Sequence, residues 1–122
     1  MLRPEPHVAY QRLVRMFAER RAADEAAIAA VRAELPRVVT LLVEKFGARR
    51  VVLFGSLASG LFHHAQSDVD LAVEGLSFAA LAAAEGEVQP ILDRKVDLVP
   101  IEAASRDLLE ELATRGEVLH GS

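Results

Sequence analysis

The chain of 122 residues has no cysteine, no tryptophan and only one tyrosine. Without cysteine it can form neither a disulfide framework nor a cysteine-based zinc site. Aromatic residues make up 5% of the sequence, too few to favour a stacking platform for single-stranded nucleic acid. The net charge is −4 and the pI is about 5.5, so the chain also lacks the basic excess that binds a phosphate backbone. We therefore expect no nucleic acid polymer among its partners.

Two further absences concern membranes. The sequence contains no long uninterrupted apolar run and no signal-peptide pattern at its N-terminus, so we expect a cytoplasmic protein without a membrane partner. What it does contain is 52% hydrophobic residues, which at this length fits one globular domain with a modest core.

The stretch from Val51 to Val73 carries the pattern with the most chemical content. Four apolar residues, Val51 to Phe54, predict a buried strand, and the pair Gly55-Ser56 follows at once. Glycine has no Cβ, so the backbone at Gly55 can turn sharply and approach a ligand closely. A turn of this kind that opens a helix can hold a phosphate group through its backbone amides. We therefore take Gly55 and Ser56 as candidate nucleotide-binding and phosphate-binding residues.

Three aspartates follow on predicted strands. Asp68 and Asp70 are two residues apart, so both carboxylates should project from the same face of a strand. Asp97 stands in a second strand-like run, and it would complete a triad if the two strands were neighbours. Such carboxylates suit Mg²⁺, which binds a few carboxylates together with water and substrate phosphates. An Asp-x-Asp strand with one solvated face is the simpler interpretation of the first pair.

In this order, Gly55-Ser56, Asp68-Val69-Asp70 and Asp97 resemble the signature of the minimal nucleotidyltransferase (MNT) domains of the DNA polymerase β-like superfamily. The resemblance covers the chain from about Pro36 to its C-terminus. It implies a domain that binds a nucleoside triphosphate, ATP, with two Mg²⁺ ions. It also implies that Asp68, Asp70 and Asp97 are the catalytic and metal-binding residues.

The best-understood small members of that family are antitoxins that silence HEPN-type ribonuclease toxins by attaching AMP to them. The resemblance therefore implies a protein adenylyltransferase with a HEPN-type toxin as its partner. Two alternatives stay open, a catalytically silent module that neutralises its partner by binding and a small-molecule nucleotidyltransferase of the aminoglycoside-modifying type. The loop favours the silent module, since eleven residues separate Ser56 from Asp68 where ten are usual, and Ser59 stands where the family often has arginine. His63 or His64 could supply the missing cation, although both fit ordinary exposed loop positions.

The rest of the pattern predicts an α/β fold, a small mixed sheet covered by helices, with an N-terminal helical extension over residues 1–35 and an MNT-like domain over residues 36–122. We expect strands over residues 49–54, 68–73 and 95–99, with a short edge strand over 117–120. Helices are expected over 36–46, in the loop 55–67, from Ser77 to Leu92 with a break near Gly86 or Pro90, and over 104–115.

The first 35 residues are rich in alanine, glutamate and arginine and contain no glycine, which predicts helix. Two apolar stripes, one around Tyr10 to Phe17 and one around Ile28 to Leu35, are separated by polar residues. They fit one long helix starting near Pro4 or Pro6, or two helices with a joint near Ala22. This segment would either pack on the sheet or serve as an arm that binds a second copy or another protein, as a homo- or hetero-oligomer.

Overall fold

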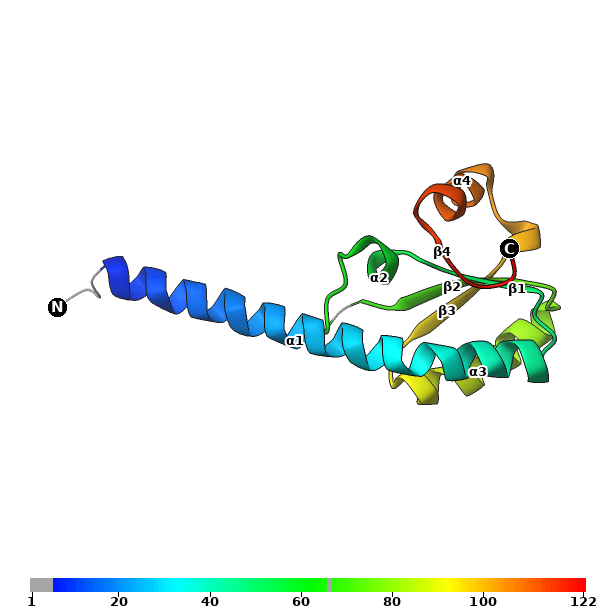
Figure 1. The fold of residues 1–122 in the computed structure, drawn as a ribbon, viewed down its shortest axis with the longest axis horizontal. Coiled ribbons are helices and arrows are strands. Elements are labelled where there is room, and N and C mark those ends of the chain that lie inside the picture. The colour runs from blue at the N-terminus through cyan, green and yellow to red at the C-terminus, as the bar shows by residue number, and fades with distance from the viewer. Residues whose placement is uncertain (1–5, 66) are drawn as a thin grey trace.

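A computed structural model describes residues 6–65 and 67–122 of the chain (Figure 1). Its helices and strands follow one another in the order α1 (Pro6–Thr40), the π-helix η1 (Leu41–Lys45), β1 (Arg50–Phe54), α2 (Ser56–Ser59), β2 (Val69–Glu74), α3 (Phe78–Leu92), β3 (Val96–Pro100), the 3-10 helix η2 (Ile101–Ala103), α4 (Arg106–Arg115) and β4 (Glu117–His120). Within these described residues, no helix is both long enough and apolar enough to cross a membrane.

The four strands form one mixed sheet in the order β3-β2-β1-β4. Strand β1 pairs antiparallel with both β2 and β4, whereas β2 and β3 run parallel. The parallel pair is joined by α3, the crossover helix that such a pair requires. The predicted α/β fold with a small mixed sheet is confirmed.

Successive side chains along each strand point to opposite faces of the sheet, so the core has two parts, one on each face. Val51, Leu53 and Leu71 are completely buried on the face that α1 and α3 cover. Val52 and Ala72 are buried on the opposite face, where they pack with Ile101 and with Leu112 of α4. Helix α4 covers only part of this second face, and the site described below lies on it.

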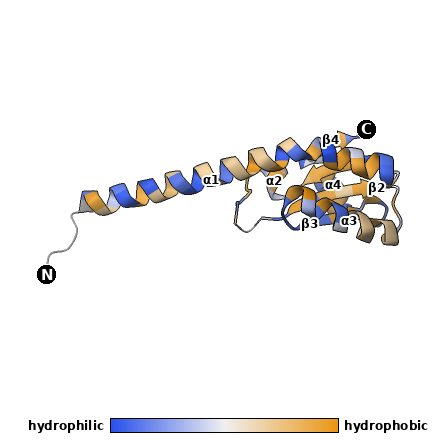
Figure 2. Ribbon diagram, turned by 90° about the horizontal axis from the view of Figure 1, so that it is seen from below, coloured by the Kyte–Doolittle hydropathy of each residue, from blue (hydrophilic) through white to orange (hydrophobic). Residues whose placement is uncertain are grey.

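Helix α1 is one continuous helix, which confirms the one-helix alternative and excludes a joint near Ala22. Its first part extends beyond the rest of the molecule, as both Figure 1 and Figure 2 show. Every side chain from His7 to Ala22 is exposed. We call this segment, residues 7–22, the arm, and the remainder of the described chain the body. The expected start near Pro4 lies outside the described residues.

The helix boundary expected at Pro36 is wrong, because α1 runs through this proline to Thr40 and continues into η1. A proline inside a helix costs about 3 kcal/mol or more, since it removes one backbone hydrogen bond and crowds the preceding turn. Here the helix is held on both sides of Pro36 by side chains packed into the core, Leu35 before it and Val38 after it. The proposed division between residues 35 and 36 therefore falls within a helix, and it remains a prediction.

The break expected in α3 near Gly86 or Pro90 is also wrong, and the reason is again packing. Helix α3 runs unbroken through both residues, with Ala84, Val88 and Leu92 buried along one face. It ends at Asp93, which adopts a left-handed backbone conformation with φ of 49°. Ser77, where the helix was expected to begin, caps its start by accepting a hydrogen bond from the amide of Ala80 at 3.1 Å.

Candidate active site

The turn after β1 places backbone directly against a carboxylate. Gly55 has φ of 77° and ψ of −152°, a conformation that side-chain-bearing residues rarely adopt. A Cβ built on Gly55 would lie 2.2 Å from Oδ2 of Asp70. Glycine is thus required here for two reasons, its backbone angles and the space that the Asp70 side chain occupies. The two motifs that the sequence separates by fourteen residues are therefore in contact.

Asp70 and Asp97 are direct neighbours across the parallel pair. The register aligns Asp70 of β2 with Asp97 of β3, so the condition set for bringing Asp97 beside Asp70, that the two strands be neighbours, is met. Both side chains project from the sheet face opposite Leu71 and Leu98, which is the face shared with α4. A pair of carboxylates therefore lies beside the Gly55 turn, where the face is left open.

The surroundings of this pair of carboxylates change the pKa of Asp70. Partial burial, followed by repulsion from Asp97, Asp68 and Glu111, raises that pKa from 3.8 to about 6. Lys95 opposes the shift but does not cancel it. Three neighbouring carboxylates thus repel the Asp70 carboxylate more strongly than Lys95 attracts it, and a bound positive ion would relieve that repulsion. Glu111 lies on α4, and nothing in the sequence pattern pointed to it.

Asp68 is placed differently from the expectation. Strand β2 begins at Val69, so Asp68 lies in the connecting loop, and the expected strand-face argument does not apply to it. Its Oδ2 is 3.7 Å from Nζ of Lys95, the residue just before β3. Asp68 still lies close enough to raise the pKa of Asp70.

The carboxylates of Asp68, Asp70 and Asp97 are suitable ligands for a hard cation, although they do not surround a common point. Among residues 6–65 and 67–122, no three His, Cys, Asp or Glu side chains are already arranged to hold a metal ion. Oxygen donors from Asp68, Asp70 and Asp97 are nevertheless the ligand type that Mg²⁺ prefers, and Mg²⁺ fills the rest of its shell with water and phosphate oxygens. The raised pKa of Asp70 is the expected sign of a carboxylate group awaiting a counter-charge.

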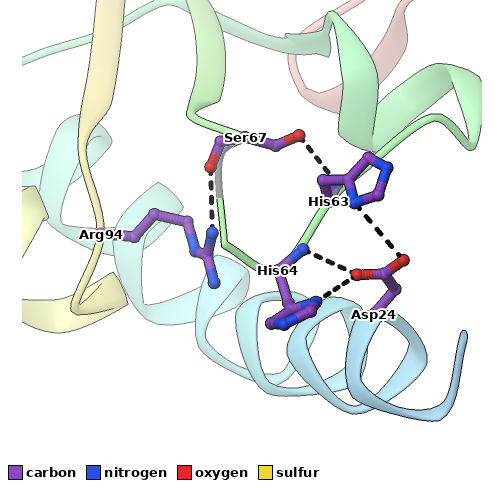
Figure 3. A network of polar contacts seen from close by, with 5 residues as sticks. All are labelled: Asp24, His63, His64, Ser67 and Arg94. Carbon is purple, nitrogen blue, oxygen red and sulfur yellow. Dashed lines mark hydrogen bonds and ion pairs between the residues drawn. The ribbon is translucent and has the colours of Figure 1, made fainter. Parts of the chain in front are cut away.

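Between α2 and β2 the chain returns to α1, where Asp24 holds it (Figure 3). Oδ1 of Asp24 accepts a hydrogen bond from the backbone amide of His64 at 2.9 Å and also contacts the ring of His64. Nδ1 of His63 lies 3.7 Å from Oδ2 of Asp24. These contacts lower the pKa of Asp24, chiefly through the hydrogen bond from the His64 amide. His63 and His64 are exposed loop residues, as the simpler expectation had it, and both pair with an acid.

The same loop is fixed at its far end by Arg94. A guanidinium nitrogen of Arg94 donates to the carbonyl of Ser67 at 3.0 Å, and the group stacks over the ring of Phe62 at 4.7 Å. Phe62 is buried and anchors the loop in the core. Arg94 and Lys95 thus bring two cations to the approach to Asp68. Neither cation was predicted from the sequence, although their position directly before the Asp97 strand was a usable signal.

Helix α2 supplies no cation of its own. The segment Ser56–Ser59 is a single turn, and the hydroxyl of Ser59 donates to the carbonyl of Ser56 at 3.3 Å. The amide of Ser59 donates to the carbonyl of Gly55 at 3.0 Å, which closes the turn. Ser59 therefore serves the turn itself, in the position where an arginine was expected from the family pattern.

With this geometry in place, the comparison with known families is decisive. Residues 35–118 match the family of nucleotidyltransferase domains, a range that includes the Gly55 turn and all three aspartates. The chain belongs to the nucleotidyltransferase domain family. As a nucleotidyltransferase, it has the enzyme class that the motifs predicted. No curated protein matches the sequence.

Solved structures place this nucleotidyltransferase among the MNT domains. It is 30% identical to a chain of a toxin–antitoxin complex solved with AMP-PNP, with a TM-score of 0.62 over 70% of this chain and 73% of that one. It is 26% identical to a chain in the complex of a tri-AMPylated HEPN toxin with an MNT antitoxin from Shewanella oneidensis, with a TM-score of 0.60 and coverage of 75% and 72%. A candidate minimal nucleotidyltransferase matches with 27% identity, a TM-score of 0.65 and coverage of 74% and 93%.

Proposed function

We propose that this nucleotidyltransferase is an antitoxin that transfers AMP from ATP to a hydroxyl group on a HEPN-type toxin and thereby neutralises it. The observation that carries the proposal is the contact of the Gly55 turn with Asp70, beside Asp97 on the neighbouring strand. The similarity to a chain in a complex that contains a tri-AMPylated HEPN toxin supports both the transferred group and the partner. The similarity to a complex with AMP-PNP supports an adenine nucleotide as the donor.

In the proposed reaction, the acceptor hydroxyl oxygen attacks the α-phosphorus of ATP. A new phosphorus–oxygen bond forms, the bond to the bridging oxygen of the β-phosphate breaks, and pyrophosphate leaves. The chain around Gly55 and Ser56 holds the outer phosphates, since the absent side chain at Gly55 lets the backbone approach closely. Asp97 accepts the proton of the attacking hydroxyl.

The carboxylates of Asp68, Asp70 and Asp97 would hold Mg²⁺, two ions in the proposed arrangement. When bound, Mg²⁺ neutralises charge on the phosphates and lowers the pKa of the attacking hydroxyl. Asp70 and Asp97 orient this site because they stand on adjacent strands in register. Lys95 and Arg94 keep the Asp68 loop near them, through the contacts at 3.7 Å and 3.0 Å described above.

A second candidate is a binding module that silences the toxin without chemistry. The observation that favours it is the absence of a cationic side chain from the described turn Ser56–Ser59, which leaves the phosphates with backbone groups but no positive charge there. Of the two candidates, the transferase agrees better with the raised pKa of Asp70, since a module that only binds a protein needs no group of repelling carboxylates.

The deciding experiment follows the fate of two phosphates. The protein, a HEPN-type toxin encoded beside it and Mg²⁺ are incubated with ATP labelled at either the α- or the γ-phosphate. We expect α-label on the toxin, strongly reduced by Asp97→Asn and unchanged by Asp93→Asn, a matched control at the exposed end of α3. Transfer of γ-label would identify a kinase. Neutralisation of the toxin without any transfer would identify the binding module.

A further inference from the structure

The arm carries an uncovered apolar stripe. Four residues spaced as neighbours on one helix face form it, and their side chains are about half to two thirds exposed: Tyr10 68%, Leu13 49%, Val14 48% and Phe17 56%. Figure 2 shows the arm as a single helix outside the body, with apolar positions along it. An apolar helix face in water contributes to stability only once another surface covers it. Nothing in the catalytic proposal uses this stripe.

The stripe continues the very face by which α1 binds the body. Eighteen residues make five full turns of an α-helix, so residues 18 apart point in the same direction. Tyr10, Leu13 and Phe17 therefore point the same way as Ile28, Val31 and Leu35, of which the last two are buried in the core. The arm thus repeats the pattern that the sheet covers further along, at a place where this chain offers no cover.

The spacing of the stripe is the same read in either direction. Its middle lies between Leu13 and Val14, which are both aliphatic. An aromatic residue stands three positions beyond each of them, Tyr10 on one side and Phe17 on the other. Two such stripes placed antiparallel would bring Tyr10 of each arm opposite Phe17 of the other and the aliphatic residues together at the centre. A surface that complements itself about a two-fold axis is what a symmetric dimer requires.

We propose that the stripe Tyr10–Leu13–Val14–Phe17 is a dimerisation surface, and that its partner is the arm of a second copy, packed antiparallel. Charge decides between the two possible directions. Arg20 and Arg21 flank the stripe at its body end, so a parallel pair would place four guanidinium groups side by side. The antiparallel pair separates the two Arg20 positions by about 20 Å along the axis, well beyond the ~8 Å Debye length at physiological salt.

The junction of arm and body offers room for the end of the second arm. A hollow of about 420 Å³ lies there, lined by Arg20, His63, His64 and Ala65. It is located on the face of α1 from which Asp24 reaches the loop, which is also the face of the stripe. In the antiparallel pair, the beginning of each arm would lie beside Arg20 of the other copy and close this hollow. The dimer would thus cover the loop that leads to Asp68.

Charge also favours this contact between copies. The arm carries four arginines and one glutamate, a net charge of +3, so the other residues together carry −7. The opposite net charges of the arm and the body favour association of two copies at long range, whereas the lining of the hollow itself includes Arg20, His63 and His64. Four large side chains a copy cover less than the ~800 Å² per partner of a standard interface, so we expect a reversible dimer whose population rises with protein concentration.

Sedimentation equilibrium of the full chain over a hundredfold concentration range tests the dimer. We expect a monomer–dimer equilibrium that weakens at least tenfold in Leu13→Glu. Val8→Glu is the matched control, because Val8 is also an exposed apolar residue of the arm but lies about 200° around the helix from Tyr10. Unchanged dimerisation in Leu13→Glu would overturn the proposal, and so would a monomer at every concentration.

Engineered cysteines test the direction, without background because the chain has none of its own. Leu13→Cys lies near the two-fold axis and should form a disulfide-linked dimer under oxidation. Tyr10→Cys alone should not, since its two copies would be about 10 Å apart along the axis and disulfides need Cα atoms within about 7 Å. A mixture of Tyr10→Cys and Phe17→Cys should cross-link. Efficient linkage of Tyr10→Cys to itself would show parallel arms.

A HEPN-type protein is the competing occupant. If the chain alone stays monomeric while Leu13→Glu, but not Val8→Glu, loses binding to that protein, the stripe belongs to the partner and self-association is rejected. The α-label experiment has a separate readout, because Asp70 and Asp97 lie on β2 and β3 and none of the substitutions in the arm touches them. A result against the dimer would therefore not count against the proposed transferase, and a result against the transferase would not count against the dimer.

Discussion

At the scale of single residues, the contact between Gly55 and Asp70 couples backbone conformation to chemistry. We expect Gly55→Ala to destabilise the fold by about 1–3 kcal/mol, because its backbone angles belong to a region almost restricted to glycine. Nucleotidyl transfer should fall more than the stability does, since the new methyl would displace the Asp70 carboxylate, 2.2 Å from it. Chemical denaturation together with the labelled-ATP assay measures both effects.

Gly86→Ala is the control for that substitution. Gly86 lies inside α3, and a Cβ added there would meet nothing within 4 Å. Replacing a helical glycine by alanine stabilises a helix by about 0.5–1 kcal/mol. We therefore expect higher stability and unchanged activity. A loss of stability in Gly55→Ala no larger than the change in Gly86→Ala would contradict the proposed role of the turn.

The raised pKa of Asp70 predicts how the metal-free protein responds to pH. Its folded-state pKa of about 6 lies above the 3.8 of the unfolded chain, so folding favours the protonated carboxyl. This contribution to stability is complete below about pH 4 and is lost as the pH rises through about 6. With EDTA present, Asp70→Asn should lack this loss and should melt a few degrees above wild type at pH 7.5.

Thermal melts of both proteins from pH 4 to pH 8 isolate the effect, because the other titrating groups are common to the two. The melting temperature of Asp70→Asn should rise relative to that of wild type between pH 4 and pH 7. A constant difference over that range would mean that burial and the repulsion from Asp97 and Asp68 do not raise the pKa of Asp70 in solution.

At the scale of elements, the part of α1 that the fold needs begins well before Pro36. Ile28 packs against the core, and Val31 and Leu35 are buried in it, whereas no side chain of the arm is buried. We expect a chain that starts at Ala23 to melt cooperatively, near the temperature of the full chain. A chain that starts at Pro36 should lose several kcal/mol, because removing one buried leucine side chain alone costs about 2–5 kcal/mol.

Circular dichroism melts of the two shortened chains decide the matter. The sequence predicted an N-terminal extension over residues 1–35, whereas the burial of Val31 and Leu35 favours residues 1–22 as the segment that can be removed with the fold intact. A cooperative melt of the shorter chain, with unchanged midpoint, would restore the original boundary at Pro36. Loss of folding in the chain that starts at Ala23 would show that the arm supports the body.

What the sequence could predict among these elements depended on periodicity. The alternation around Asp70 and Asp97 predicted two strands, whereas their pairing stayed a condition that the sequence pattern alone did not decide. Proline and glycine predicted breaks at Pro36 and Gly86 that burial of Val38 and Val88 overrides. The contact of Asp24 with His64, forty positions away, has no local signal at all, because it arises only where α1 passes the loop.

At the scale of the whole molecule, a bound nucleotide and Mg²⁺ should together connect the Gly55 turn with the carboxylates of β2 and β3. Ligands that bind only the folded protein stabilise it, by about 2.7 kcal/mol at a hundred times their dissociation constant. We expect AMP-PNP with Mg²⁺ to raise the melting temperature at pH 7.5 by several degrees, and each alone to raise it less. Phosphate oxygens complete the shell of an ion that the protein holds only in part, so the two should bind cooperatively.

The shift in melting temperature that AMP-PNP and Mg²⁺ cause should depend on pH. At pH 5, Asp70, with its pKa of about 6, is mostly protonated and can no longer attract a cation, so the shift should shrink. Asp70→Asn should show the small shift at both pH values, whereas Asp93→Asn should behave as wild type. If Asp70→Asn kept the full shift at pH 7.5, the nucleotide would be bound elsewhere on the molecule. The carboxylates on β2 and β3 would then need another explanation for their proximity.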